Sequence, residues 1–159
     1  MAEKGKFVHV FGAPFTGKTY LIAKLYHEID NVSVVNYELF LKEGGYDKFY
    51  ESIEEKLSAG KNVIAESVNN QWGRRRMICE ESCSLHVFAY PSNDIHKRNF
   101  ENFKRLAGQK YADTRTGSFG IDKLRDSVKL PWLKQKDRLI RFTGNNYSEI
   151  KEAISCHFK

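Results

Sequence analysis

The chain has 159 residues and a mass of 18.5 kDa, and 41% of its residues are hydrophobic and 29% charged. This composition is typical of a globular protein, and the length indicates one domain over residues 1–159. No apolar run approaches the roughly 18 residues that cross a bilayer, and the N-terminal residues lack the apolar stretch of a signal peptide. We therefore expect no membrane association, no secretion and a cytoplasmic location.

The charge and the cysteines give two weaker indications. Lys and Arg total 26 against 20 Asp and Glu, so the net charge is +6, which is a hint of a polyanionic partner. The three cysteines, Cys79, Cys83 and Cys156, are too few for a disulfide framework. Cys79 and Cys83 are four residues apart, but no second pair completes a zinc site. Reduced thiols are the expectation.

Short β-prone runs alternate along the chain with longer amphipathic runs. The predicted strands span residues 6–11, 32–35, 62–66, 85–90 and 138–142. The predicted helices span residues 17–29, 46–57, 71–83, 95–106, 121–129 and 147–157. Residues 108–120 show no clear period and are expected to form a mobile loop. The alternation predicts an α/β fold of three layers, a five-stranded parallel sheet with helices on both faces, which binds ligands beyond the carboxyl ends of its strands.

A phosphate-binding motif follows the first predicted strand directly. It reads Gly12-Ala13-Pro14-Phe15-Thr16-Gly17-Lys18-Thr19, which matches G-x-x-x-x-G-K-[ST] (the Walker A pattern) without departure. Its glycines let backbone amides turn toward phosphate oxygens, and the next helix adds the positive end of its dipole. Lys18 is expected to reach the β- and γ-phosphates, and Thr19 to offer its hydroxyl to magnesium. The motif predicts nucleotide binding; the alternative is a glycine-rich turn with an incidental lysine.

The rest of the sequence narrows the class of nucleotide-binding protein. GTPases usually add a D-x-x-G switch and an N-K-x-D guanine motif, and neither occurs here. ATPase machines usually have larger domains and a hydrophobic strand that ends in Asp, whereas here the third strand ends in Glu66. The small size and the arginine-rich second half favour a phosphotransferase.

A carboxylate, Glu38, lies just beyond the second predicted strand. In this place it can accept the proton of an attacking hydroxyl and orient that hydroxyl in line with the γ-phosphate. The alternative is an ordinary solvated glutamate near a helix N-terminus.

A second group of polar residues follows the third strand. Glu66 could hold magnesium through water, and Ser67 and Asn69 can hydrogen-bond phosphate or acceptor groups. Arg74 and its two neighbours either contact the acceptor or form a solvated face, and Trp72 either stacks on a base or packs on the sheet.

Cations follow the fourth strand and define a predicted lid over approximately residues 95–120. Arg98 and Arg105 are seven residues apart, near one face of a helix, and Arg115 follows in the irregular segment. Arginines from a lid can cover a triphosphate and neutralise charge in the transition state. The alternative is an amphipathic helix with surface arginines.

On these residues the chain resembles the phage-type, polynucleotide-kinase-like branch of P-loop phosphotransferases, over nearly all of its length and in order. The resemblance rests on Gly12 to Thr19, on Asn36-Tyr37-Glu38, on Glu66-Ser67-Val68-Asn69 with Arg74 eight residues beyond Glu66, and on His96-Lys97-Arg98-Asn99. That family moves the γ-phosphate of ATP to a hydroxyl of a nucleic acid. The resemblance implies that Lys18 and Thr19 hold phosphate and magnesium, that Glu38 stands in the place of the general base, that Arg98 belongs to the lid, and that Arg74 is near the acceptor.

The chain departs from the family pattern in three places. The base and the third-strand acid are normally Asp, and here both are Glu, which is one methylene longer. Leucines and a phenylalanine at residues 39–41 replace the expected acceptor arginine. Asn102 stands where a second lid arginine is expected, so Arg105 or Arg115 would supply that charge. With these departures a hydroxymethyl group on a modified pyrimidine in DNA fits as well as a 5′-hydroxyl end.

The sequence therefore predicts a kinase that uses ATP or another nucleoside triphosphate, with Mg²⁺, on a hydroxyl of a nucleic acid, most simply DNA. The predicted catalytic residues are Lys18, Glu38 and Arg98. The triphosphate is assigned to residues 12–19 with Arg98 and Arg105, the metal to Thr19 and Glu66, and the acceptor to Glu38, Ser67, Asn69 and Arg74. No obligate protein partner is evident. Two alternatives stay open: a kinase of a nucleoside, nucleotide or sugar, and a nucleotide-binding regulatory or toxin-like module.

Overall fold

The computed structural model describes residues 3–68, 84–116, 120–128 and 139–159. Its strands are β1 (Phe7–Phe11), β2 (Val32–Asn36), β3 (Asn62–Ser67), β4 (Ser84–Ala89) and β5 (Leu139–Phe142). Its α-helices are α1 (Lys18–Glu28), α2 (Gly45–Ser58), α4 (Asn93–Ala107), α5 (Gln109–Thr116), α6 (Gly120–Leu124) and α7 (Tyr147–Phe158). Two short 3₁₀ helices, η1 (Tyr37–Phe40) and η2 (Arg125–Ser127), complete the set.

The five strands form one sheet in the order β2-β3-β1-β4-β5, and every pairing between neighbours is parallel. β1 is central and all five of its residues are buried, as expected for a parallel strand that is covered on both faces. Because all strands point the same way, their carboxyl ends meet at one edge of the sheet. The predicted α/β fold class is confirmed.

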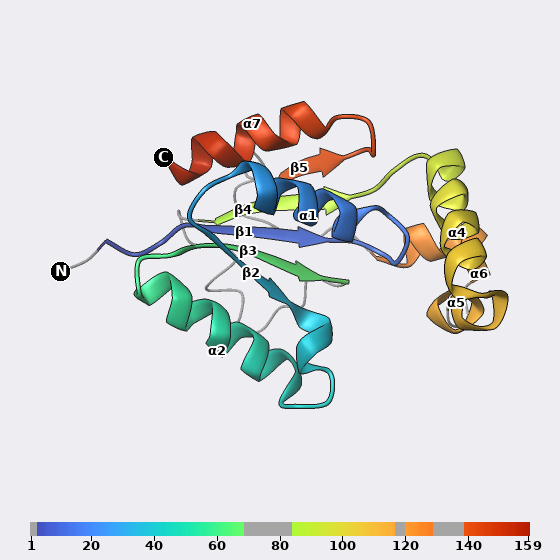
Figure 1. The fold of residues 1–159 in the computed structure, drawn as a ribbon, viewed down its shortest axis with the longest axis horizontal. Helices are drawn as coiled ribbons and strands as arrows, with labels where there is room; N and C mark the ends of the chain where they lie inside the picture. Colours follow the sequence, from blue (N-terminus) through green and yellow to red (C-terminus); the bar gives the residue numbers. More distant parts are fainter. Residues whose placement is uncertain (1–2, 69–83, 117–119, 129–138) are drawn as a thin grey trace.

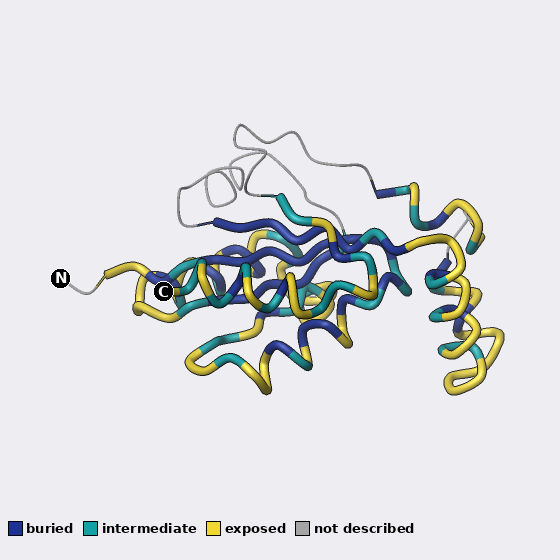
Figure 2. The backbone as a smooth tube through the Cα atoms, turned by 90° about the horizontal axis from the view of Figure 1, so that it is seen from above, coloured by how far each residue is buried: buried dark blue, intermediate teal, exposed yellow. Residues whose placement is uncertain are grey.

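Helices cover both faces of the sheet (Figure 1). Alternate residues of β1 point to opposite faces: Val8 and Val10 pack with Leu21 and Leu25 of α1 and with α7, and Phe7 packs on the α2 side. The buried strands form the middle layer, with more exposed helices outside it (Figure 2). None of the helices in the described ranges is long and apolar enough to cross a membrane.

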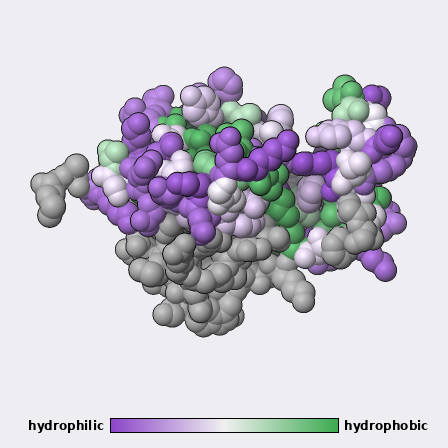
Figure 3. Space-filling view, turned by 90° about the horizontal axis from the view of Figure 1, so that it is seen from below, coloured by the Kyte–Doolittle hydropathy of each residue, from purple (hydrophilic) through white to green (hydrophobic). Residues whose placement is uncertain are grey.

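Helices α4, α5 and α6 stand together beyond the carboxyl edge of the sheet, apart from the main body (Figures 1 and 2). A cluster of Phe11, Ala13, Phe88, Leu124 and Val128 joins the strand ends to α6 and the segment after it. Apolar side chains gather along this junction in the surface view (Figure 3). Helices α4 and α5 lie largely within the predicted lid of residues 95–120, and α6 begins at its last residue; the group of three helices is called the lid below.

Two predictions in this part of the chain are wrong in detail. Residues 108–120 were expected to be irregular, but α5 occupies Gln109–Thr116. That helix buries only Ala112 and Thr116, so it has no apolar stripe by which a period could be detected. The helix expected over residues 121–129 is a short α6 followed by the 3₁₀ turn η2. The helix predicted over residues 71–83, which includes Arg74 and Trp72, lies outside the described residues.

Candidate active site

The phosphate-binding motif forms a loop between β1 and α1, as its sequence position predicts. Gly17 has φ 91°, in the left-handed region that glycine adopts without strain. Gly12 lies so close to β4 that a Cβ there would come within 2.6 Å of the Ala89 carbonyl oxygen. Thr16 closes the loop by donating its hydroxyl to the Ala13 carbonyl at 2.7 Å. Both glycines of the motif are therefore required by the backbone path.

Helix α4 supports this loop from the lid side. The Asn99 side-chain amide donates to the Phe15 carbonyl at 3.0 Å, and His96 Nε2 lies 2.9 Å from the Pro14 carbonyl. Because a carbonyl only accepts, Nε2 of His96 carries the proton. Burial lowers the pKa of His96, which keeps the ring neutral. The motif spacing gave no signal for these two contacts, although both residues belong to the segment that carries the resemblance.

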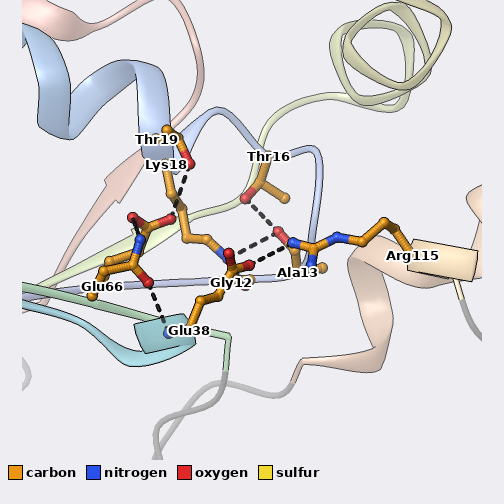
Figure 4. Close-up of polar contacts among 9 residues, drawn as sticks. Gly12, Ala13, Thr16, Lys18, Thr19, Glu38, Glu66 and Arg115 are labelled. Atoms are coloured by element: carbon orange, nitrogen blue, oxygen red, sulfur yellow. Dashed lines mark hydrogen bonds and ion pairs between the residues drawn. The ribbon is translucent and has the colours of Figure 1, made fainter. Parts of the chain in front are cut away.

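Lys18 is the cation of the loop, and it is buried. Its side chain is only 7% exposed, and its Nζ donates to the carbonyls of Gly12 and Ala13 (Figure 4). Burial lowers the pKa of Lys18 to about 8, although the carboxylates of Glu66 and Glu38 act to raise it. In this conformation the ammonium is bound to its own loop, and a phosphate would have to draw it away.

Glu66 is the penultimate residue of β3, next to the loop, and its two carboxylate oxygens have different partners. Thr19 donates its hydroxyl to Oε1 at 3.2 Å, and the Asn36 amide donates to Oε2 at 3.2 Å. Burial raises the pKa of Glu66, while Lys18 and the Thr19 hydrogen bond lower it. A hydroxyl and a carboxylate are the hard oxygen donors that Mg²⁺ prefers, and Mg²⁺ usually needs only one or two protein ligands. Thr19 and Glu66 therefore fit the predicted metal.

Glu38 meets the lid through an ion pair. It is the second residue of η1, where the Asn36 side chain accepts from its backbone amide at 2.9 Å. Arg115 of α5 reaches across and places Nη2 2.5 Å from Oε1 of Glu38 (Figure 4). The two residues are 77 positions apart, and only the fold brings them together.

A cavity of about 370 Å³ connects these groups. Its described lining is residues 14–20, 36–38, 66–68, 99, 102, 103 and 115. The phosphate loop, the carboxylates of Glu38 and Glu66, and one lid arginine thus share a single space. Ser67 also borders it, with its Oγ 2.6 Å from Nε2 of the buried His9.

The structure distributes the predicted lid arginines unequally. Arg98 is exposed on α4 and does not belong to the described lining of the cavity. Arg105 is also exposed and donates to the Asn102 side chain at 2.9 Å. Arg115 is the lid arginine that the fold places at the cavity. Asn69 and Arg74, predicted to contact the acceptor, lie outside the described residues.

Several cavity residues were not predicted from the sequence. They include Tyr20 of α1, Tyr37 of η1, and Asn99, Asn102 and Phe103 of α4. On α4, residues 99, 102 and 103 repeat at the three- and four-residue spacing of one helix face, so a helical-wheel projection could have indicated them.

The sequence matches no protein-family model and no curated protein. Solved structures do match. A provisionally named kinase from Chloroflexus aurantiacus j-10-fl is similar with a TM-score of 0.68 at 15% identity, over 98% of this chain and 96% of that one. A gluconokinase from Sinorhizobium meliloti 1021 is similar with a TM-score of 0.61 at 11% identity, over 99% and 93%. A chain of the Pnkp1/Rnl/Hen1 RNA repair complex is similar with a TM-score of 0.55 at 16% identity, over 80% of this chain and 45% of that one. Together with the loop from Gly12 to Thr19, these similarities show that the chain has the fold of P-loop kinases.

Proposed function

We propose that the protein is a kinase that transfers the γ-phosphate of ATP, or of another nucleoside triphosphate, to a hydroxyl group of a nucleic acid. The observation that carries the proposal is the shared cavity, in which the phosphate loop with Lys18 faces the carboxylate of Glu38. Lys18 is close enough to Glu38 for the carboxylate to raise its pKa. A donor site and a proton acceptor in one space are what phosphoryl transfer to an alcohol requires.

In the proposed reaction the acceptor oxygen forms a bond to the γ-phosphorus, and the bond from that phosphorus to the β–γ bridging oxygen breaks. Glu38 takes the hydroxyl proton, and the nucleoside diphosphate leaves with the bridging oxygen. Lys18 leaves the loop carbonyls and binds phosphate oxygens. Mg²⁺ held by Thr19 and Glu66 would supply charge neutralisation at the phosphates. Arg115 is placed to exchange its Glu38 partner for a phosphate of the donor, which frees Glu38 for the acceptor.

Three lines support a nucleic acid as the acceptor. The chain carries a net charge of +6, as expected where phosphodiesters run along a protein surface. The ordered resemblance to polynucleotide kinases covers the loop, residues 36–38, residues 66–69 and residues 96–99. One structural neighbour is a chain of an RNA repair complex. A small-molecule acceptor is the second candidate, because a gluconokinase also shares the fold.

An acceptor screen with γ-labelled ATP tests the proposal. The acceptors are DNA with 5′-hydroxyl ends, RNA, DNA with hydroxymethylated pyrimidines, free nucleosides and gluconate. We expect label in the polymer, and Lys18→Ala should remove nearly all of it while the protein stays folded. Label in a small product alone would establish the small-molecule alternative, and no transfer to any hydroxyl would favour the nucleotide-binding regulatory module.

A further inference from the structure

An aromatic stack ends at the wall of the cavity. The Tyr37 ring lies on Tyr46 with centroids 4.0 Å apart and planes 15° apart, and Tyr46 in turn stacks with Tyr50 at 6.1 Å and 24°. Phe49 meets the Tyr37 ring edge-on at 5.5 Å. Phe49 and Tyr50 belong to the buried face of α2. The Tyr37 ring is therefore fixed by its contacts with Tyr46 and Phe49, and Tyr37 also forms part of the cavity lining.

The charges in the described lining of this cavity balance. Lys18 and Arg115 are its cations, and Glu38 and Glu66 are its anions. The Lys18 ammonium donates to carbonyls of the phosphate loop, and Arg115 forms an ion pair with Glu38. These residues offer no unbalanced cation to an acidic acceptor such as a phosphomonoester or a sugar acid. The described lining therefore favours an uncharged part of the acceptor.

We propose that Tyr37 stacks on a nucleobase of the acceptor, so that the hydroxyl offered to Glu38 belongs to a nucleotide that carries its base. This inference rests on the proposed function and specifies its acceptor. Tyr37 and Glu38 are consecutive residues of η1, so the ring and the carboxylate are presented by the same turn at the end of β2. Stacking on an aromatic ring tolerates any base and needs no charge, which fits a neutral, aromatic-walled cavity.

The test measures binding rather than transfer. Fluorescence anisotropy compares a labelled single-stranded thymidine oligonucleotide with an abasic oligonucleotide of equal length and charge, in the presence of a non-hydrolysable ATP analogue. Tyr37→Leu should weaken binding of the base-bearing oligonucleotide about tenfold and leave the abasic one unchanged. Tyr37→Phe keeps the stacking ring and should bind within about twofold of the wild type. Tyr26→Leu is the matched control, because Tyr26 is an exposed tyrosine of α1 that does not border the cavity.

Two results would overturn the inference. One is that Tyr37→Leu binds the base-bearing oligonucleotide as tightly as the wild type does, or loses affinity equally for both oligonucleotides. The second result is that the wild-type protein binds the abasic oligonucleotide as tightly as the base-bearing one. This measurement needs no variant, so it tests the inference even if Tyr37→Leu fails to fold. Affinity for the ATP analogue and the thermal midpoint report whether each variant is folded. Failure of the proposed function would appear separately, as an absence of phosphoryl transfer by a protein that still discriminates the two oligonucleotides.

Discussion

Raising the pH should weaken nucleotide binding through Lys18. Burial holds the pKa of this ammonium at about 8 in the free protein, and a phosphate interacts with its protonated form. At about pH 9 only about a tenth of the free protein would carry that proton, so the dissociation constant should rise about tenfold per pH unit above the pKa. Calorimetric titration of a non-hydrolysable ATP analogue between about pH 7 and pH 9.5 measures this rise. Lys18→Arg is the control, because a guanidinium stays protonated throughout that range.

The lowered pKa of Lys18 also makes the free energy of unfolding depend on pH. The ordinary pKa of the lysine is 10.5, so between about pH 8 and that value the unfolded chain binds the proton more firmly than the folded chain. The free energy of unfolding should therefore rise with pH across this window, by up to roughly 3 kcal/mol. Replacing the buried charge by Lys18→Met should raise the free energy of unfolding at pH 7 by roughly 1–3 kcal/mol, measured by urea denaturation, while transfer is lost. Two results together would refute the assignment of a buried, phosphate-directed lysine. One is a wild-type nucleotide affinity that depends on pH no more than that of Lys18→Arg, and the other is a Lys18→Met protein that is less stable than the wild type.

Further outcomes concern Glu38, the lid arginines and a buried histidine. Glu38→Gln should lower kcat about 10²- to 10⁴-fold with the ATP affinity retained. It should cost less than about 1 kcal/mol of stability, because its ion pair is half exposed; loss of ATP binding instead would make Glu38 structural. Arg115→Ala should lower kcat about 10²-fold or more, whereas Arg98→Ala should lower it less than about threefold. Steady-state kinetics with the larger loss in Arg98→Ala would show that Arg98, and not Arg115, is the arginine that acts on the phosphates. Burial, His86 and Lys18 lower the pKa of His9, so the free energy of unfolding should fall as the pH drops below about 6.5, and His9→Leu should show a smaller fall in urea denaturation.

The fold could be predicted from the sequence because its signals are local. The β-prone run before Gly12 predicts a strand, and the phosphate-binding motif requires a strand on one side and a helix on the other. Ser92 is of a residue type that favours helix N-caps, and in the structure its hydroxyl caps α4 by accepting the Ile95 amide at 3.3 Å. Helix α5 was missed because it is held by its neighbours in the lid and not by an apolar stripe. Where a helix buries little of its surface, periodicity carries no information about it.

The candidate site was predictable only in part, for a different reason. Glu38 follows β2 and Glu66 lies near the carboxyl end of β3. Because the carboxyl ends of parallel strands meet at one edge, the placement of both residues beside the loop follows from the pattern of elements. Which lid arginine reaches the cavity depends on how three short helices pack, and no sequence spacing relates Arg115 to Glu38. The phase of α4 did contain a usable signal: its buried residues His96 and Phe100 lie one turn apart, and Arg98 falls between them on the other side of the helix.

The balance of charge in the cavity changes the meaning of the net charge of +6. The described lining contributes two cations and two carboxylates, so the positive excess of the chain lies outside that lining. Positive charge outside the cavity attracts the phosphate backbone of a nucleic acid. Such binding releases counterions, so its affinity falls steeply as the salt concentration rises. The proposed nucleotide binding depends on Lys18, which is buried, so salt screens this charge far less. Raising the salt from about 50 to 200 mM should therefore weaken oligonucleotide binding at least tenfold, with a change of less than about threefold in the affinity for the ATP analogue. Equal salt dependence for both ligands would mean that the excess charge serves the nucleotide, and the charge argument for a nucleic-acid acceptor would then fail.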